Sequence, residues 1–309
     1  MKKYLTITVR EQMQGMTVEK VLYDYLELTK KQVSRAKFRP DGICKNKVQC
    51  RVTEKVSMGD EICICLETDE IQSAQLVLAK IQGERLRILY EDEDLIFVDK
   101  PAGIVSHPSK GHLSDSMING VQAYFENEGR EKNERSNIHL IGRLDKETSG
   151  ILGIAKNSVT AERMIKQRQR GILIKEYYAL VKGNPPEEGI LEIPMEEMRD
   201  ARDGDKLKMK VGKSENAKTA KTFFQVVKRF EKFSLVSLVI ETGRTHQIRF
   251  HMASIGCPLL GDSFYGDGPE LGISRTALHA QQLTFTHPFC EKVMRIESEM
   301  PKDLSFLLC

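Results

Sequence analysis

The sequence predicts an α+β protein whose larger part is built on a mixed, mostly antiparallel β-sheet. Short stretches of strand-type alternation recur along the 309 residues, without the regular strand-helix alternation of a doubly wound fold. The apolar run at residues 151–155 is typical of a buried strand. The N-terminal region is smaller and more basic, so we expect a separate small α/β module ahead of the sheet.

The first 68 residues carry the patterns of two helices and four short strands. Helical spacing is expected over residues 18–26 and again, after the candidate N-cap Thr29, through Ala36. Strand patterns are expected, in chain order, at residues 4–9, around Ile43, around Val48 and at residues 61–66.

Basic residues dominate residues 30–55. This segment contains nine lysines and arginines and only two acidic residues, a composition typical of a surface that contacts phosphate groups. Lys30, Lys31 and Arg35 fall on the expected second helix, so they are candidate RNA-binding residues. A solvated basic face without a ligand is the alternative. Over the whole chain the formal net charge is only +3, which permits a nucleic-acid partner without requiring one.

We place a linker at residues 69–84, where the sequence is polar, and a larger domain at residues 85–309. Alternation at residues 86–90, a turn and an apolar strand at residues 95–98 open that domain.

The sequence favours a soluble, cytoplasmic protein without a cofactor. Residues 4–9 alternate, unlike a signal peptide, and no stretch has the length of a transmembrane helix. The seven cysteines are expected to be reduced. Cys63 and Cys65 share one strand face, and we interpret them as small core residues rather than zinc ligands. No metal-ligand spacing or nucleotide-binding glycine loop is evident, so we expect neither metal nor cofactor.

The most informative stretch is residues 142–150, Gly-Arg-Leu-Asp-Lys-Glu-Thr-Ser-Gly. It places Asp145 on a loop that enters a buried strand, where a rigid scaffold can aim a carboxylate into a cleft. An ordinary turn is the alternative, because Asp, Thr, Ser and Gly are common loop residues.

Two later segments offer further candidates. Tyr177 and Tyr178 are neighbours in a strand-like run, so they point to opposite faces and only one can face a cleft. Thr245 is a candidate N-cap for a helix that ends at Gly256 and has an apolar stripe of Ile248, Met252 and Ile255. The start of this helix is a candidate phosphate site because it is flanked by Arg244, His246 and Arg249.

Over roughly residues 85–309, the chain resembles the RluA family of RNA pseudouridine synthases. The matching strings are Lys-Pro-Ala-Gly at residues 100–103, Arg-Leu-Asp-x-x-Thr-Ser-Gly at 143–150, Lys-x-Tyr-x-Ala at 175–179, Gly-Arg-Thr-His-Gln-Ile-Arg-x-His at 243–251 and Gly-Asp-x-x-Tyr-Gly at 261–266. The basic N-terminal module resembles the ribosomal-protein-type RNA-binding domain often fused ahead of such enzymes.

The resemblance implies roles for individual residues around a central RNA-binding cleft. Asp145 corresponds to the catalytic aspartate, and Arg249 to the arginine that pairs with it. Tyr177 is the tyrosine selected by the motif, where its ring can stack on the target uracil. Arg143 is implied to fill the gap that a flipped-out nucleotide leaves. Arg244, Thr245 and His246 are then candidate substrate-binding residues.

One position departs from the family pattern. The family commonly has histidine just before the motif arginine, and this chain has Gly142. We expect this difference to affect how the flipped-out state is held and which RNA is chosen, more than the core chemistry.

The function implied is isomerisation of uridine to pseudouridine in structured RNA, and we take a monomer as the simplest default. Large-subunit ribosomal RNA is the first expected substrate and transfer RNA the second. A catalytically silent RNA-binding protein on the same scaffold is one alternative. A hydrolytic glycosidase is another, but no second catalytic carboxylate is evident.

Overall fold

The chain folds into two compact units, Met1–Ile71 and Gln72–Cys309. The computed structural model describes residues 4–26, 28, 30–39, 41–65, 86–109, 111–130, 138–200, 206–215, 217–290 and 292–308. Residues 69–84, where we expected a linker, and Thr29, the expected N-cap, lie outside these ranges.

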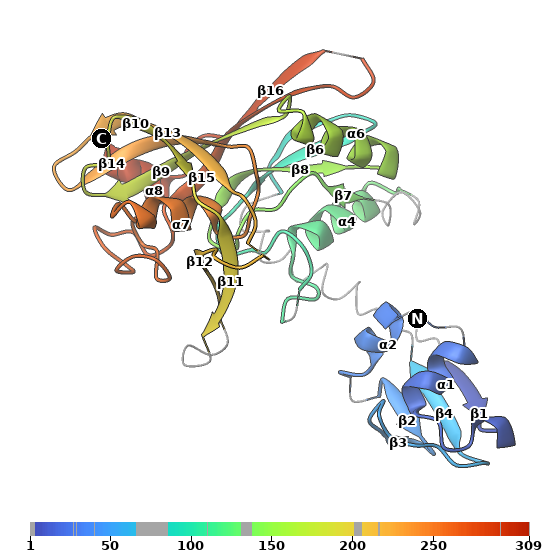
Figure 1. The fold of residues 1–309 in the computed structure, drawn as a ribbon. Helices are drawn as coiled ribbons and strands as arrows, with labels where there is room; N and C mark the ends of the chain where they lie inside the picture. The colour runs from blue at the N-terminus through green and yellow to red at the C-terminus, as the bar shows by residue number, and fades with distance from the viewer. Residues whose placement is uncertain are drawn as a thin grey trace. The chain divides into compact units, whose positions relative to one another are not determined.

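The N-terminal unit is a four-stranded sheet with helices packed against it (Figure 1). Its strand order is β1-β4-β2-β3. The elements are β1 (Tyr4–Thr8), η1 (Glu11–Met13), α1 (Val18–Asp24), α2 (Lys30–Ala36), β2 (Ile43–Lys45), β3 (Val48–Gln49) and β4 (Glu61–Cys65). Helix α1 begins where Thr17 Oγ1 accepts a hydrogen bond from the Lys20 N–H. One core contains residues of both helices and of the sheet, among them Val21, Val33 and Ile62.

The second unit is organised by a ten-stranded mixed sheet. Its main path runs β10-β13-β14-β9-β15-β8-β6-β5, with β16 added to β15 and β7 to β8. Every pairing is antiparallel except β15 with β8, so the predicted fold class is confirmed. The strands are β5 (Ile88–Glu91), β6 (Leu95–Lys100), β7 (His139–Leu140), β8 (Ser149–Ala155), β9 (Ile174–Lys182), β10 (Glu188–Glu192), β13 (Lys221–Arg229), β14 (Phe233–Ile240), β15 (Leu278–Thr286) and β16 (Val293–Glu297).

Helices cover both faces of the β6–β8 part of the sheet. Residues of α4 (Met117–Asn127) and α7 (Gln247–Ser254) share one core with Ile96 and Leu152. Residues of α6 (Ser158–Gln169) pack in another core with Phe97 and Ile151. Successive strand residues therefore enter opposite cores, which explains why every residue of β8 is buried. The chain ends with α8 (Lys302–Ser305) and η3 (Phe306–Leu308).

A two-stranded ribbon of β11 (Met195–Asp200) and β12 (Lys206–Val211) projects from this unit (Figure 1). Its base is anchored, because the Met209 N–H donates to Tyr265 Oη at 2.7 Å.

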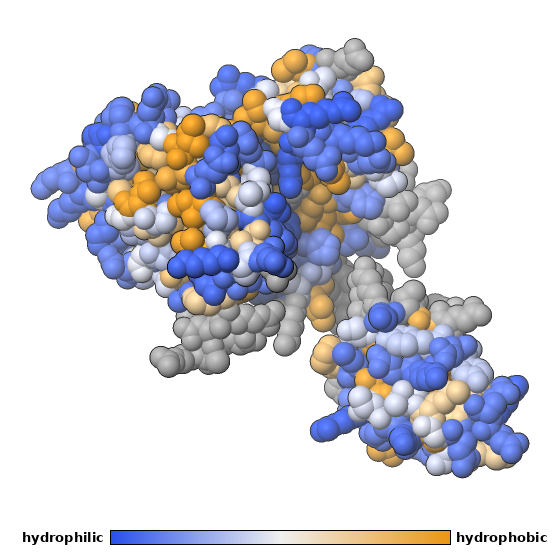
Figure 2. Space-filling model, viewed as in Figure 1, coloured by the Kyte–Doolittle hydropathy of each residue, from blue (hydrophilic) through white to orange (hydrophobic). Residues whose placement is uncertain are grey.

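The surface of both units is largely hydrophilic on the face that Figure 2 shows, with hydrophobic residues in patches. None of the helices in the described part of the chain has the length and apolar character that a membrane crossing requires.

Candidate active site

Asp145 lies on the loop between β7 and β8, with 30% of its side chain exposed. The Thr148 N–H donates to the Asp145 carbonyl at 3.1 Å and closes a turn, after which the chain enters β8. Gly150 allows this entry, because its φ is +106° and an added Cβ would lie 2.3 Å from the Ala280 carbonyl oxygen. The glycine that closes the motif is therefore required by the parallel pairing of β8 with β15.

Buried hydrogen-bond donors bind the backbone of the Asp145 loop. The ammonium of the fully buried Lys100 donates to the carbonyls of Pro101 and Lys146, at 2.8 and 3.0 Å. Arg275 Nη1 donates to the Glu147 carbonyl at 3.0 Å. Burial lowers the pKa of Lys100 to about 7, against the opposing charges of Glu147 and Asp145. These contacts fix the backbone that follows Asp145.

The hydroxyl of Ser106 forms hydrogen bonds with the same loop. Oγ donates to the Leu144 carbonyl at 2.7 Å and accepts from the Leu144 N–H at 3.0 Å. The backbone immediately before Asp145 is therefore fixed as well.

Arg249 contacts two aspartates. Its Nε and Nη2 donate to the two carboxylate oxygens of the fully buried Asp262, at 2.6 and 2.8 Å. Its Nη1 lies 3.7 Å from Asp145 Oδ2. Burial alone would lower the pKa of Arg249, but the hydrogen bonds and charge of Asp262 outweigh it and raise the pKa. Asp262 thus orients a permanent cation beside Asp145.

The start of α7 differs from the prediction. The N-cap is His246, with a left-handed φ of 55°, and not Thr245. The loop is held instead by Gln247, whose Oε1 accepts from Thr242 Oγ1 at 2.7 Å and from the Arg244 N–H at 3.1 Å. A capping rule could not predict this, because the side chain that binds the loop comes from inside the helix. The predicted helix stop at Gly256 is confirmed.

Strand parity places Tyr177 on the Asp145 side of the sheet. Tyr177 is buried in the core that includes Leu144, whereas Tyr178 packs against a different core. Burial raises the pKa of Tyr177 and the charge of Asp145 raises it further, so its hydroxyl remains protonated. Tyr177 and Asp145 line the same two hollows.

Two connected hollows surround Asp145, with volumes of about 160 and 60 Å³. Both are lined by Arg143, Asp145, Tyr177 and Arg244, and Arg143 and Arg244 are exposed. Thr245 lines the larger hollow, and His246 and Arg249 line the smaller one. The arrangement presents Asp145 and one aromatic ring among several cations, and Glu241 also lines the larger hollow.

His246 occupies a half-buried position at the smaller hollow. Its Nδ1 lies 3.1 Å from Tyr265 Oη. Burial lowers the pKa of His246, although the charge of Asp145 opposes this shift, so the imidazole is neutral at pH 7. It therefore offers a hydrogen-bonding group rather than a permanent charge.

The remaining candidates lie in the N-terminal unit. Lys30 is exposed on α2, and the side chains of Lys31 and Arg35 lie outside the described residues.

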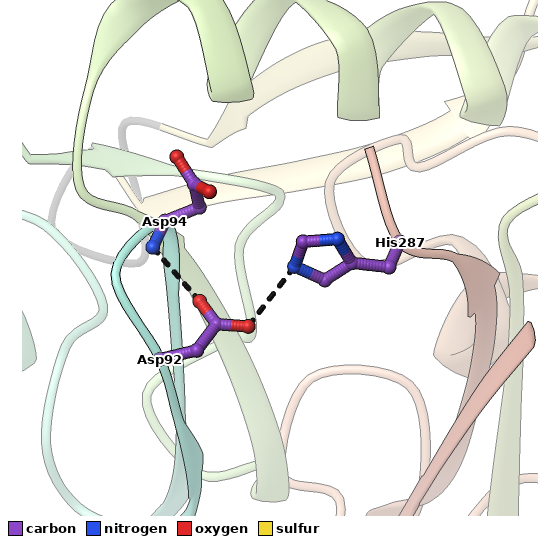
Figure 3. Close-up of side chains that lie close together, drawn as sticks. All are labelled: Asp92, Asp94 and His287. Carbon is purple, nitrogen blue, oxygen red and sulfur yellow. Dashed lines mark hydrogen bonds and ion pairs between the residues drawn. The ribbon is translucent and has the colours of Figure 1, made fainter. Parts of the chain in front are cut away.

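The ionisable side chains of Asp92, Asp94 and His287 lie close together in a separate cluster (Figure 3). Asp92 Oδ1 accepts from the N–H groups of Asp94 and Leu95, and Asp92 Oδ2 lies 3.0 Å from His287 Nε2. Asp94 Oδ1 accepts from Asn157 and Thr160 at the start of α6. Because their oxygens already accept protein hydrogen bonds, we interpret the group as a link between the β5–β6 turn, α6 and the end of β15.

Several residues of this site were not predicted from the sequence. Asp262 and Lys100 belong to the family-matching strings at residues 261–266 and 100–103, but neither was assigned a role. Arg168, which lines the larger hollow, lies on α6 and had no signal in the sequence. Its place depends on how α6 packs.

Known proteins similar to this chain share one description. The family model described as RNA pseudouridylate synthase matches residues 94–254. An uncharacterized RNA pseudouridine synthase of Bacillus subtilis (strain 168), YlyB, is 33% identical over 315 residues, covering 98% of this chain and 97% of that protein. Ribosomal large subunit pseudouridine synthase D of Nitrosomonas europaea is 30% identical over 313 residues, covering 98% of this chain and 87% of the relative.

A solved structure agrees with these sequence matches. The chain is similar to human RNA pseudouridylate synthase domain containing 4, with a TM-score of 0.60 and 26% identity. The match covers 77% of this chain and 96% of the human one.

Proposed function

Because the chain belongs to the RNA pseudouridylate synthase family and is therefore an RNA pseudouridine synthase, we propose that Asp145 is its catalytic carboxylate and large-subunit ribosomal RNA its first substrate. The ribosomal preference is supported by the names of relatives such as the Nitrosomonas europaea enzyme. Transfer RNA remains the second substrate to test.

The observation that supports Asp145 is its combination of fixed backbone, partial exposure and cationic neighbour. Its loop backbone is hydrogen-bonded to Lys100 and Ser106, its side chain is 30% exposed, and Arg249 Nη1 lies 3.7 Å away. The reaction breaks the bond between N1 of uracil and C1′ of ribose, and forms a bond between C5 and C1′. The proton lost from C5 is balanced by one gained at N1. A carboxylate can assist by attacking ribose or by removing a proton, and both roles require close approach to the nucleotide.

Tyr177 and Arg143 have complementary proposed roles. The neutral ring of Tyr177 is the stacking surface for the flipped-out uracil. Arg143 lines both hollows and is exposed, so we assign its side chain to the space that the target nucleotide leaves. Arg244, Thr245 and His246 line the hollows and are proposed to contact the nucleotide or its neighbours.

The N-terminal unit is proposed to bind RNA. The nine basic residues between positions 30 and 55 support this role, and Lys30 is exposed on α2. Lys31 and Arg35 lie on the same helix. Residues 1–68 would then increase RNA affinity, while residues 85–309 carry the chemistry.

The test is pseudouridine mapping with the purified protein. Cellular RNA from a strain that lacks the protein is incubated with wild type or with Asp145→Asn, and pseudouridine is located site by site. We expect wild type to modify large-subunit ribosomal RNA and Asp145→Asn to modify none. New sites confined to transfer RNA would replace the substrate assignment. Activity retained by Asp145→Asn would exclude Asp145 as the catalytic carboxylate, and release of free uracil would indicate a hydrolase.

A further inference from the structure

Two basic side chains occupy the space beside two glycines in the larger hollow. Lys175 of β9 reaches toward Gly142, where an added Cβ would lie 2.7 Å from its Nζ. Arg168 of α6 reaches toward Gly243, where an added Cβ would lie 3.6 Å from its Nη1. All four residues line the hollow of about 160 Å³ that also contains Asp145.

The space that Lys175 occupies depends on the absence of a side chain at Gly142. A distance of 2.7 Å is shorter than side-chain carbons normally reach, so any larger residue at position 142 would displace the Lys175 ammonium. The absence of a side chain at Gly142 therefore allows Lys175 to place its charge next to the Asp145 loop.

These two cations have no anionic partner in the part of the chain that the structure describes. No hydrogen bond or ion pair joins either head group to a carboxylate there. Asp145 instead contacts Arg249, and Glu241, the other acidic residue of the hollow, pairs with Lys221 at 3.8 Å. Burial lowers the pKa of Lys175 to about 8, and the neighbouring charge of Arg168 contributes.

The half-buried Lys175 ammonium and the exposed Arg168 guanidinium carry like charges, so an anion bound between them lowers the free energy of the pair. An RNA nucleotide brings such an anion to this position. The phosphates on either side of a target uridine are covalently joined to the ribose on which Asp145 is proposed to act. A ribose at Asp145 therefore places a phosphate within reach of the same hollow.

We propose that Lys175 and Arg168 form a phosphate-binding subsite that holds an RNA backbone phosphate adjacent to the target uridine, and that Gly142 provides the space for the Lys175 ammonium. The subsite rests on the proposed function, because it places the ribose of the target uridine at Asp145. Its two cations act on binding and positioning, whereas Asp145 acts on the reacting bonds.

The first test measures binding and turnover with unmodified large-subunit ribosomal RNA transcribed in vitro. Lys175→Met should raise KM roughly tenfold while kcat changes less than about twofold, because the variant has no ammonium to bind the substrate phosphate. It should also reduce the salt dependence of RNA affinity, by about 0.7 to 0.9 in the slope of log K against log salt. Arg168→Gln should act in the same direction, and Lys175→Arg should preserve the slope.

The matched control is Lys166→Gln. Lys166 lies on the same helix as Arg168 but pairs with Glu162 at 2.7 Å and does not line the hollow, so it should leave KM and the slope unchanged. The subsite is wrong if Lys175→Met and Arg168→Gln leave the salt slope at the wild-type value, or if they lower kcat alone.

A second test examines Gly142 directly. Gly142→Ala should raise KM in the wild-type background, because the new Cβ displaces the Lys175 ammonium. The same change in the Lys175→Met background should have little further effect. Equal effects of Gly142→Ala in both backgrounds would contradict the assigned relation between the two residues.

The outcomes separate this subsite from the proposed function. If wild type forms no pseudouridine in the transcript, the substrate assignment fails, and the salt slopes of binding still decide the subsite. If wild type forms pseudouridine and the slopes of Lys175→Met and Arg168→Gln equal that of wild type, only the subsite fails.

Discussion

Asp145 and Asp262 approach the same arginine from two loops, and their surroundings differ. Asp262 is fully buried, both of its oxygens accept from Arg249, and Oδ1 also accepts from the Phe264 N–H at 2.8 Å. Asp145 is 30% exposed and lies 3.7 Å from the guanidinium. One carboxylate is committed to protein donors, and the other remains accessible to a substrate.

This difference separates residues that build the site from residues available for chemistry. A buried carboxylate whose oxygens are occupied orients its partner, while an accessible one can approach a reacting bond. Tyr177 and Tyr178, on opposite faces of β9, and the two chain units offer two further contrasts. Four predictions test these contrasts, from the largest expected effect to the smallest.

Asp262→Asn should destabilise the protein strongly. It removes the buried charge that is hydrogen-bonded to the Arg249 guanidinium and leaves only the more distant Asp145 as an ion-pair partner, and breaking such a buried pair costs about 3–5 kcal/mol. The matched variant Asp145→Asn should lower the unfolding free energy by less than about 1 kcal/mol, because Asp145 is partly exposed. Urea denaturation measures both, and equal losses would remove the contrast between the aspartates.

Tyr177→Leu should lower kcat/KM by roughly 5- to 150-fold, because stacking on one base is worth about 1–3 kcal/mol. Tyr178→Leu, on the opposite face of β9, is the control and should retain activity. Thermal unfolding of both variants distinguishes an effect on stacking from an effect on stability. If Tyr178→Leu impairs turnover more than Tyr177→Leu does, the strand-parity assignment is incorrect.

The activity should fall at alkaline pH. The pKa of Lys175 is lowered to about 8, so its ammonium is present below pH 8 and is lost as the pH rises through that value. If this ammonium binds phosphate, kcat/KM should decrease above pH 8, by at most about tenfold per pH unit. The other ionisable groups that line the hollow are two carboxylates, three arginines and Tyr177. Lys175→Arg should remove the decrease, and an unchanged profile would assign it to another group.

Neutralising the basic helix of the N-terminal unit should have the smallest effect on turnover. The triple variant Lys30→Gln, Lys31→Gln and Arg35→Gln should reduce the salt slope of RNA affinity by about 0.7 to 0.9 for each phosphate that the helix no longer binds. The value of kcat at saturating RNA should remain near wild type. The control Lys20→Gln changes one charge on α1, outside the basic segment, and should leave the slope unchanged. A triple variant with an unaltered slope would argue against RNA binding by this unit.

Much of the fold could be predicted because it depends on local patterns. Alternation at residues 4–9 and the apolar runs at 95–98 and 151–155 correspond to β1, β6 and β8. Helices α4 and α6 were not predicted. In α6 the buried positions Thr160, Ala161 and Met164 stand among many charged residues, so its hydrophobic periodicity is weak.

The sequence by itself identified the family, the fold class and the segments that carry Asp145, Tyr177 and Arg249. Each of these three residues lies in a contiguous string that matches a motif of the family. Only the tertiary structure decided which groups meet. Asp262 binds Arg249, and the ammonium of Lys175 occupies the space beside Gly142, 33 positions away in the sequence. Such pairings depend on strand order, helix packing and the room left by a missing side chain, and no local pattern encodes these three-dimensional distances.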